Sequence, residues 1–241
     1  MNSRIIYDLG LHTGKDAEFY LRKGFDVVAV EANSRLAHST GERLANYVSA
    51  GRLKIIEKAI WHEDDQEVPF FVNDEKDDWS SLFKGESEKG VSTSREIRVT
   101  TITLAQLFAR YGVPYYMKCD LEGGDMLVAQ HLIRQSEKPQ YVSFEITKLD
   151  ILGALQLAGY KKYQLVNQSY NHFTQPPNPA REGIFVDARF DGHSSGLFGR
   201  DLPTEAWVGF EEIAKIYVDF MDLRRRHGLL VRGWLDIHAT Y

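Results

Sequence analysis

Short apolar runs alternate with longer amphipathic stretches through the first two-thirds of the chain. The runs are rich in β-branched residues, whereas the longer stretches carry apolar residues at helical spacing. This alternation predicts an α/β fold in which crossover helices connect a mainly parallel sheet. The expected strands are 5–9, 26–31, 53–58, 68–72, 97–101, 115–120 and 140–145, and the expected helices are 15–23, 34–49, 103–110, 124–134 and 147–158.

The pattern changes after Gly159 and Tyr160, which end the last of these helices. Two apolar runs, 161–166 and 183–188, follow without a helix between them, so they predict an antiparallel pair of strands. Apolar residues at steps of three and four then predict a helix over 204–226. Its apolar stripe fits either the core or the contact surface of a homo-oligomer.

Length and composition fit one domain of this kind. We expect 1–241 to form a single domain with an insertion at about 62–98 and a C-terminal helical tail at about 190–241. The net charge of −5 disfavours a general nucleic-acid-binding protein, which usually presents a basic face. The single cysteine, Cys119, excludes intrachain disulfides and fits a reducing compartment. With no signal pattern and no apolar run near the ~20 residues of a membrane span, the sequence predicts a soluble cytoplasmic protein.

The most informative segment joins the first strand to the first helix. Asp8 ends the strand, Gly10 and Gly14 form a turn, and the next strand ends in Glu31. This arrangement predicts a nucleotide-binding unit. The spacing differs from the Gly-x-Gly-x-x-Gly of dinucleotide-binding proteins, and a carboxylate would repel a pyrophosphate. S-adenosylmethionine carries an ammonium group and no phosphate, so it suits Asp8 better, while Glu31 suits ribose hydroxyls.

Two alternatives remain open for this segment. In the first, the glycines only make a turn and Asp8 caps the following helix. In the second, the ligand is NAD and the chain is an oxidoreductase. His12 lies inside the turn, where we expect it near the ligand and not on a metal. Because the eight histidines are dispersed, the sequence predicts no metal site.

The segment from Tyr115 to Asp125 predicts an acid–base cluster. Residues alternate across a strand, so Lys118 and Asp120 should lie on one side near its carboxyl end. Glu122 follows at the turn, and Glu145 ends the next strand. Ligands of open α/β sheets bind at the carboxyl ends of the strands, so we expect these acids to face one crevice. The alternative is a structural ion pair between Lys118 and Asp120.

These motifs, in this order, resemble the FkbM-type family of S-adenosylmethionine-dependent methyltransferases over roughly residues 5–160. The Lys-x-Asp-x-Glu-Gly element at 118–123 is the most specific part. The resemblance implies a three-layer Rossmann-like class I methyltransferase fold, with a mainly parallel seven-stranded sheet and a C-terminal antiparallel strand pair. The matching pieces are Asp8 to Gly14, Glu31-Ala32-Asn33, Ala59-Ile60, Ser80-Ser81-Leu82, Lys118 to Gly123, Phe144-Glu145 and Gly159-Tyr160.

The resemblance also implies S-adenosylmethionine as the cofactor and O-methylation of a small molecule, often a sugar. It places the glycine turn around the methionine end of the cofactor, Glu31 on the ribose and Asp120 near the sulfonium. Ala59 and Ile60 would border the adenine. The implied cofactor-binding residues are Asp8, Gly10, His12, Gly14, Glu31, Ala32, Asn33, Ala59, Ile60, Ser81 and Asp120. His12 departs from the asparagine common at its position, and Gly124 from a larger residue.

In the expected reaction a substrate hydroxyl attacks the methyl group of the cofactor. A hydroxyl is a poor nucleophile at neutral pH, so a general base is needed, with Asp120 as first candidate and Glu122 as second. Lys118 would orient Asp120 or stabilise the developing alkoxide. Glu145 would position the substrate.

Substrate recognition is expected from the segments 73–94 and 168–200. The acceptor would be a saccharide, a glycoside or a nucleotide-sugar. A methyltransferase-like fold that binds without catalysis is the remaining alternative. The candidate acceptor residues are Trp79, Tyr170, His172 (also an alternative base) and Phe173, which could instead anchor their loops to the sheet.

Overall fold

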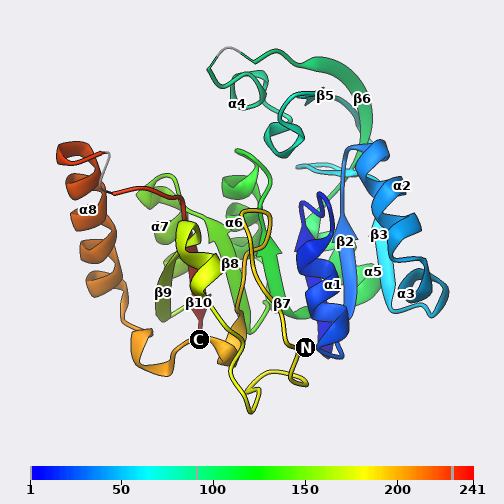
Figure 1. Cartoon of the computed structure of the whole chain (residues 1–241). Coiled ribbons are helices and arrows are strands. Elements are labelled where there is room, and N and C mark those ends of the chain that lie inside the picture. The colour runs from blue at the N-terminus through cyan, green and yellow to red at the C-terminus, as the bar shows by residue number, and fades with distance from the viewer. Residues whose placement is uncertain (1, 91, 229–230) are drawn as a thin grey trace.

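The computed structural model describes residues 2–90, 92–228 and 231–241. Residue 91, inside the predicted insertion, and residues 229–230, inside the predicted tail, lie outside the described residues. Seven strands form the main sheet in the order β3-β2-β1-β7-β8-β10-β9, and β10 runs in the direction opposite to the other six (Figure 1). The strands are β1 (Asn2–Leu9), β2 (Asp26–Val30), β3 (Leu53–Ile56), β7 (Pro114–Cys119), β8 (Tyr141–Glu145), β9 (Lys162–Asn167) and β10 (Leu235–Thr240).

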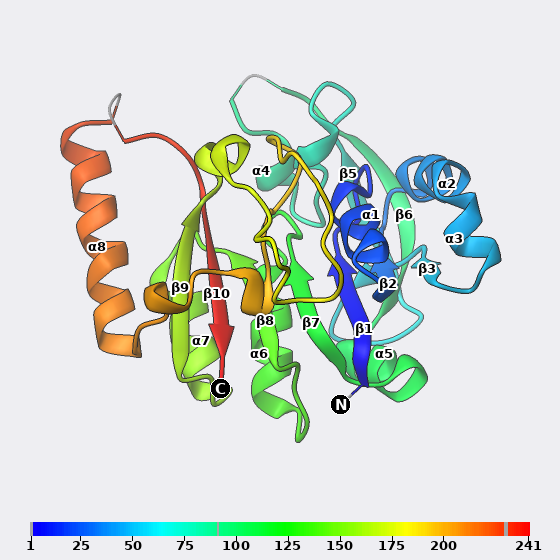
Figure 2. The same ribbon diagram turned by 60° about the horizontal axis from the view of Figure 1, so that its bottom comes forward.

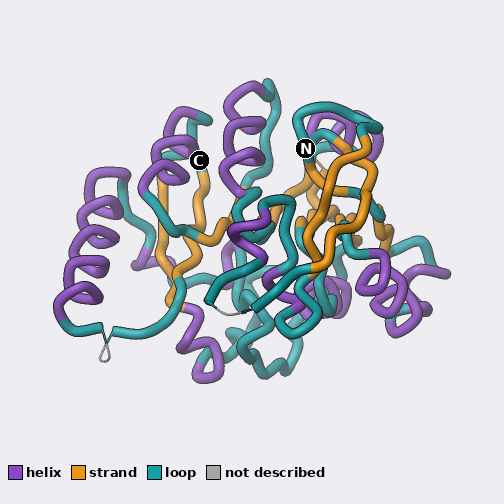
Figure 3. The backbone as a smooth tube through the Cα atoms, turned by 90° about the horizontal axis from the view of Figure 1, so that it is seen from above, coloured by secondary structure: helices purple, strands orange, loops and turns teal. Residues whose placement is uncertain are grey.

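Helices cover both faces of this sheet, which gives the three layers expected from the sequence (Figure 3). The helix α8 stands at the outer edge, beside β9 (Figure 1). None of the helices in the described ranges combines the length and apolarity needed to cross a bilayer. The helices are α1 (Lys15–Arg22), α2 (Ser34–Arg43), α3 (Ala45–Ser49), α5 (Leu104–Tyr111), α6 (Asp125–Arg134), α7 (Leu149–Leu157) and α8 (Phe210–Arg226).

The side chains of β1 point alternately to the two faces of the sheet. Tyr7 and Leu9 pack in the core that α5, α6 and α7 cover, whereas Ile6 packs with the residues of α1. Successive side chains of a strand point to opposite faces, so Asp8 lies on the same face as Ile6. In β7, Lys118 is the residue paired with Asp8. The charged end of the predicted ligand site therefore lies on the α1 face of the sheet.

A second, smaller sheet lies above the carboxyl ends of the main strands (Figure 1). Its strand order is β4-β6-β5, with β4 (Ala59–Ile60), β5 (Glu67–Val72) and β6 (Arg95–Ile102). Between β5 and β6 lie the short helices η1 (Asp77–Trp79) and α4 (Lys84–Ser87). We call the segment from β5 to β6 the cap. It overlaps most of segment 62–98, and the description of that segment as an insertion stays a prediction.

The prediction of a strand at 183–188 is wrong. The antiparallel partner of β9 is β10, at the end of the chain, and it is inserted between β8 and β9. Segment 183–188 is irregular and runs over the sheet face that α1 also covers (Figure 2). Within this run Val186 packs with α1, together with the later residues Phe190 and Phe198, whereas Ile184 and Phe185 stay exposed. The run therefore lies as a loop over the sheet and is buried only in part.

The C-terminal tail also differs from its prediction. The helix expected at 204–226 begins at Phe210, because residues 204–206 form a separate 3₁₀ turn, η4 (Thr204–Ala206). The tail is therefore helical only in part, since it ends in β10. Two further 3₁₀ segments, η2 (Gln168–Phe173) and η3 (Gly199–Asp201), lie between β9 and η4.

Candidate active site

A cavity of about 350 Å³ opens at the carboxyl ends of the parallel strands and is lined on one side by the cap. This is where ligands bind in doubly wound sheets. The structure brings these predicted residues together in its lining: Gly10, His12, Glu31, Ala32, Ala59, Ile60, Lys118, Asp120, Glu122 and Glu145. Four predicted cofactor residues, Asp8, Gly14, Asn33 and Ser81, are not part of that lining, and their role in cofactor binding stays a prediction.

The turn after β1 brings the two sequence motifs into contact. Gly10 has φ +91°, and a Cβ atom there would lie 1.9 Å from the backbone oxygen of Asp120. Only glycine therefore allows this approach. The Gly10 N–H donates to the Val30 carbonyl at 3.0 Å, which ties the turn to the end of β2. Gly14, also at positive φ, precedes α1 and packs against Thr40.

Glu31 is fixed by the backbone of two neighbouring turns. Its Oε2 accepts the His12 N–H and its Oε1 accepts the Asn33 N–H, both at 2.8 Å. Burial raises the pKa of Glu31, although the two N–H bonds work in the opposite direction. Each carboxylate oxygen keeps a second lone pair. The side chain can therefore accept hydrogen bonds from ligand hydroxyls without losing its own anchors.

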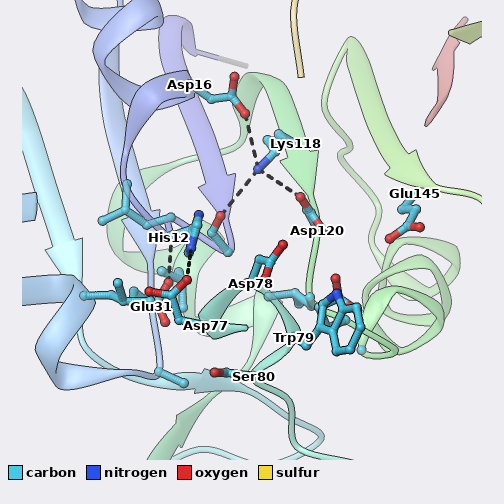
Figure 4. A pocket seen from close by; sticks show the side chains of 18 of the residues that line it. His12, Asp16, Glu31, Asp77, Asp78, Trp79, Ser80, Lys118, Asp120 and Glu145 are labelled. Carbon is cyan, nitrogen blue, oxygen red and sulfur yellow. Dashed lines mark hydrogen bonds and ion pairs between the residues drawn. The ribbon is translucent and has the colours of Figure 1, made fainter. Parts of the chain in front are cut away.

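Lys118 is buried at the centre of three carboxylates (Figure 4). Its Nζ lies 3.5 Å from Asp8 Oδ1, 3.4 Å from Asp16 Oδ2 and 3.4 Å from Asp120 Oδ2. Burial alone would lower the pKa of Lys118, but the attraction of these acids outweighs it and holds the pKa well above its usual value. The ion pair weighed from the sequence is thus present. Asp16, on α1, has no strand-end position and was missed from the sequence.

Asp8 is fully buried behind Lys118. Burial raises its pKa, and Lys118 opposes that rise. Asp8 therefore holds Lys118, whereas Asp120, whose side chain is 45% exposed, faces the cavity. Of the two carboxylates, Asp120 is the one placed to meet a ligand.

Asp120, Glu122 and Glu145 have carboxylate oxygens that all lie within 4.8 Å of one another. Burial and then the charge of Asp120 raise the pKa of Glu145 to about 8. Burial also raises the pKa of Glu122 to about 7, even though Lys89 Nζ lies 2.7 Å from it. Three oxygens at this spacing could also hold a hard divalent cation, so the expectation that no metal binds stays a prediction.

Two lining residues from the end of the chain, Trp234 and Asp236, were missed by the sequence reasoning. Asp236 lies opposite Glu145 in the antiparallel pairing of β10 with β8. It is 7% exposed, and Gln168 Nε2 donates to its Oδ2 at 2.6 Å. Strict apolar–polar alternation over residues 235–240 is the signal that could have identified this strand.

The cap is attached to the glycine turn and to the acid cluster. Asp77 lies 3.1 Å from His12 Nε2 and 3.3 Å from Arg35 Nη2 (Figure 4). Ser81 Oγ donates to the Glu122 carbonyl at 2.6 Å. Ser81 therefore anchors the cap over the cavity.

Of the expected acceptor residues, the cavity contains only Trp79, which the cap contributes. Tyr170, His172 and Phe173 lie on η2 outside the cavity lining. Tyr170 is 56% and Phe173 74% exposed. Their predicted part in acceptor binding has no support from this arrangement.

A doubly wound sheet with a cavity at its carboxyl edge is the architecture of Rossmann-like nucleotide-binding enzymes. Residues 8–161 match the family model of the methyltransferase FkbM domain, and the chain belongs to this family. The family supports a methyltransferase over the dehydrogenase alternative. No curated protein matches the chain.

The chain is also similar to solved structures, at low sequence identity. One is precorrin-6y C5,15-methyltransferase from Geobacter metallireducens, with a TM-score of 0.40, 10% identity, and coverage of 99% of this chain and 80% of that one. A second is the StiE O-MT, with a TM-score of 0.45, 7% identity, and coverage of 98% and 67%. A third is a putative methyltransferase from Thermoplasma acidophilum, with a TM-score of 0.41, 9% identity, and coverage of 99% and 68%.

Proposed function

We propose that the protein is an S-adenosylmethionine-dependent O-methyltransferase that acts on a hydroxyl of a small molecule, a saccharide. One observation carries the proposal. A single cavity joins the backbone-held carboxylate of Glu31 to the carboxylates of Asp120, Glu122 and Glu145. A hydroxyl-binding acid and an acid–base cluster are the two components that such an enzyme requires.

The residues at the Glu31 end fit this cofactor. Glu31 has free lone pairs for two ribose hydroxyls, and Ala32, Ala59 and Ile60 give an apolar wall for the adenine. Gly10 leaves room for backbone approach beside Asp120. When bound, S-adenosylmethionine supplies an activated methyl group next to a positive sulfonium.

The acid cluster would align the acceptor and take its proton. Asp120 is the first candidate for the general base because it is held by Lys118 and faces the cavity. Glu122 is the second, and Glu145 would position the acceptor by accepting a hydrogen bond from a neighbouring hydroxyl. Lys118 acts here as a positioning residue, since three carboxylates already surround its ammonium group.

Thermal-shift titration with S-adenosylhomocysteine and with NAD tests the cofactor assignment. A ligand that binds only the folded state raises the unfolding temperature. We expect stabilisation by S-adenosylhomocysteine, and stabilisation by NAD alone would refute the proposal. Transfer of a labelled methyl group to a saccharide, detected by mass spectrometry, tests catalysis. Cofactor binding without transfer to any acceptor would instead favour a non-catalytic binding module.

A further inference from the structure

The lining of the cavity is built by two separate parts of the chain. Residues 8–161, which match the family model, contribute the acid cluster and Trp79. The chain beyond residue 161 contributes a second wall to the same cavity. In this wall Asp236 pairs with Glu145 across the β8–β10 ladder, whereas the His193 ring centroid lies 5.7 Å from that of His12 in the glycine turn. The other residues of the second wall are Gln168, Gly192, Ser194, Ser195 and Trp234. The residues of this second wall lie outside the part of the chain that matches the family model.

Trp234 is an exposed indole held in a fixed backbone position. The residue is 43% exposed, and its indole makes no ring contact or side-chain hydrogen bond with the described residues. Gly233 before it has φ +106°, and a Cβ there would lie 2.1 Å from Asn167 Oδ1. The Gly233 carbonyl accepts a hydrogen bond from Arg224 at 3.0 Å. A fixed but uncovered indole at the mouth of a cavity is suited to stacking on a ligand.

Trp79 supplies a second aromatic wall from the cap. Its 3₁₀ turn is fixed by the contact of Asp77 with His12, and the Lys76 ammonium lies 5.6 Å from its ring centroid. Figure 4 shows the Trp79 indole in the same opening as Asp120 and Glu145. The cavity thus has one tryptophan from the cap and one from the C-terminal segment.

Two carboxyl groups on adjacent strands line the same cavity as the two tryptophans. Glu145 and Asp236 are directly opposite in the β8–β10 ladder, so their side chains lie on the same face of the sheet. Gln168 donates a hydrogen bond to the Asp236 side chain, whereas the Glu145 side chain forms no hydrogen bond or ion pair with the described residues. Carboxyl groups in this setting are partners for ligand hydroxyls.

Every lysine in the described cavity lining already has a carboxylate partner, and no arginine belongs to that lining. A phosphate would therefore meet Glu145 and Asp236 without an unpaired cation to compensate its charge, which is unfavourable. The lysine pairs are Lys15 with Asp191, Lys58 with Asp65, Lys89 with Glu122, and Lys118 with Asp8, Asp16 and Asp120.

We infer that the acceptor is a phosphate-free saccharide or glycoside whose ring lies between Trp79 and Trp234, with its hydroxyls on Glu145 and Asp236. This inference rests on the proposed function and narrows it, because it excludes nucleotide-sugars and sugar phosphates. The apolar C–H face of a sugar ring matches an indole, and its hydroxyls match the carboxyl groups.

Methyl transfer to matched trios tests the substrate class. Each trio contains a methyl hexoside, the hexose 6-phosphate and the uridine diphosphate hexose, for glucose, galactose and mannose. We expect the uncharged member to be methylated at least about tenfold faster than its charged counterparts. Faster methylation of a phosphorylated member would overturn the inference. So would failure of every trio while S-adenosylhomocysteine still stabilises the protein. Failure of S-adenosylhomocysteine to bind would refute the proposed function instead.

Trp234→Ala and Trp79→Ala test the location of this site. Each should weaken binding of the methylated saccharide by about tenfold, measured by calorimetry with S-adenosylhomocysteine present. Trp207→Ala is the matched control, because Trp207 packs near Tyr141 outside the cavity lining and should leave this affinity unchanged. Equal effects of all three substitutions, or no effect of Trp234→Ala, would refute the aromatic walls. Binding of S-adenosylhomocysteine should remain within about threefold in each variant, which separates an acceptor effect from misfolding.

Discussion

The two ends of the cavity both present buried or half-buried carboxyl groups, but they differ in what holds these groups. At the end of the cavity that contains Glu31, called the ribose end after its proposed ligand, both oxygens of Glu31 accept backbone N–H groups. At the acid end, Glu122 contacts the side chain of Lys89 and Asp236 that of Gln168. The carboxyl group of Glu145 has no hydrogen-bond partner among the described residues. A carboxylate held by backbone N–H donors is fixed in place, which suits a binding group. A carboxyl group without such donors is free to exchange a proton or to accept a hydrogen bond from the methyl acceptor.

The largest effect is expected at the acid end, from Asp120→Asn. An amide cannot take the proton of the acceptor, so kcat should fall by about 10²–10⁴-fold. S-adenosylhomocysteine lacks the positive sulfonium, so its affinity should change by less than about threefold. Steady-state kinetics and calorimetry give the two values. Asp78→Asn is the control, because Asp78 is an exposed carboxylate of the same cavity. Full turnover by Asp120→Asn would remove Asp120 as the base.

Gly10→Ala should disrupt the contact between the glycine turn and the Asp120 backbone, where the two ends of the cavity adjoin. The added Cβ would clash with the Asp120 carbonyl at 1.9 Å in a backbone conformation of φ +91°. We expect a loss of about 3 kcal/mol in the free energy of unfolding and a loss of S-adenosylhomocysteine binding. Urea denaturation and calorimetry measure these changes.

Gly24→Ala is a matched control for that substitution. Gly24 has φ +94°, and a Cβ there would meet no atom within 4 Å. It therefore carries the backbone strain alone, about 1 kcal/mol, and should keep cofactor binding. Equal effects of the two substitutions would show that the contact of Gly10 with Asp120 is unimportant.

The two ends of the cavity were predicted from two different signals in the sequence. Glu31 and Gly10 belong to one local unit of strand, turn, helix and strand, whose spacing carries the signal. Lys118 and Glu145 were predicted because parallel strands bring their carboxyl ends to one edge. These residues do line the cavity, while their roles remain predictions.

The second wall could not be predicted in the same way. Asp236 reaches the site only because β10 enters the sheet between β8 and β9, a pairing across about ninety residues. The sequence analysis assigned the partner strand of β9 to the apolar run at 183–188, whereas the structure has residues 235–240 there. Hydrophobicity alone does not distinguish a strand from a loop that covers the sheet. The contact of Lys118 with Asp16 likewise depends on how α1 packs on the sheet. No local sequence pattern predicts that packing.

Glu31→Gln should weaken cofactor binding at the ribose end, by a smaller factor than the loss of kcat expected from Asp120→Asn. An amide offers one acceptor oxygen where the carboxylate offers two, so one backbone N–H and one ribose hydroxyl lose their charged partner. Hydrogen bonds to charged groups contribute about 1.5–3 kcal/mol, which corresponds to about 10–100-fold weaker binding of S-adenosylhomocysteine. Glu57→Gln, outside the cavity lining, is the control and should bind normally. Unchanged affinity in Glu31→Gln would contradict a ribose contact.

The smallest expected effect is a change in how stability depends on pH, from Glu145→Gln. The pKa of Glu145 is raised to about 8 by burial and by Asp120, well above the value near 4.3 of an unfolded chain. Between these values the folded protein keeps a proton that the unfolded chain has lost, so stability falls as pH rises toward 8. Gln cannot ionise, so Glu145→Gln should be more stable than wild type at pH 9 by on the order of 1 kcal/mol.

Urea denaturation at pH 6 and at pH 9 checks this sign. Glu31→Gln gives the contrasting result, because it disrupts backbone hydrogen bonds and should be less stable than wild type at both values. Stabilisation of both variants at pH 9, or of neither, would show that the two ends do not differ as described.

Calorimetric titration of S-adenosylhomocysteine into wild type, Glu31→Gln and Asp120→Asn tests the central claim most directly. If one end of the cavity binds the cofactor and the other performs chemistry, wild type binds one equivalent. Glu31→Gln then binds at least about tenfold more weakly, and Asp120→Asn binds within about threefold of wild type. No binding to wild type, or a larger loss in Asp120→Asn than in Glu31→Gln, would contradict that division.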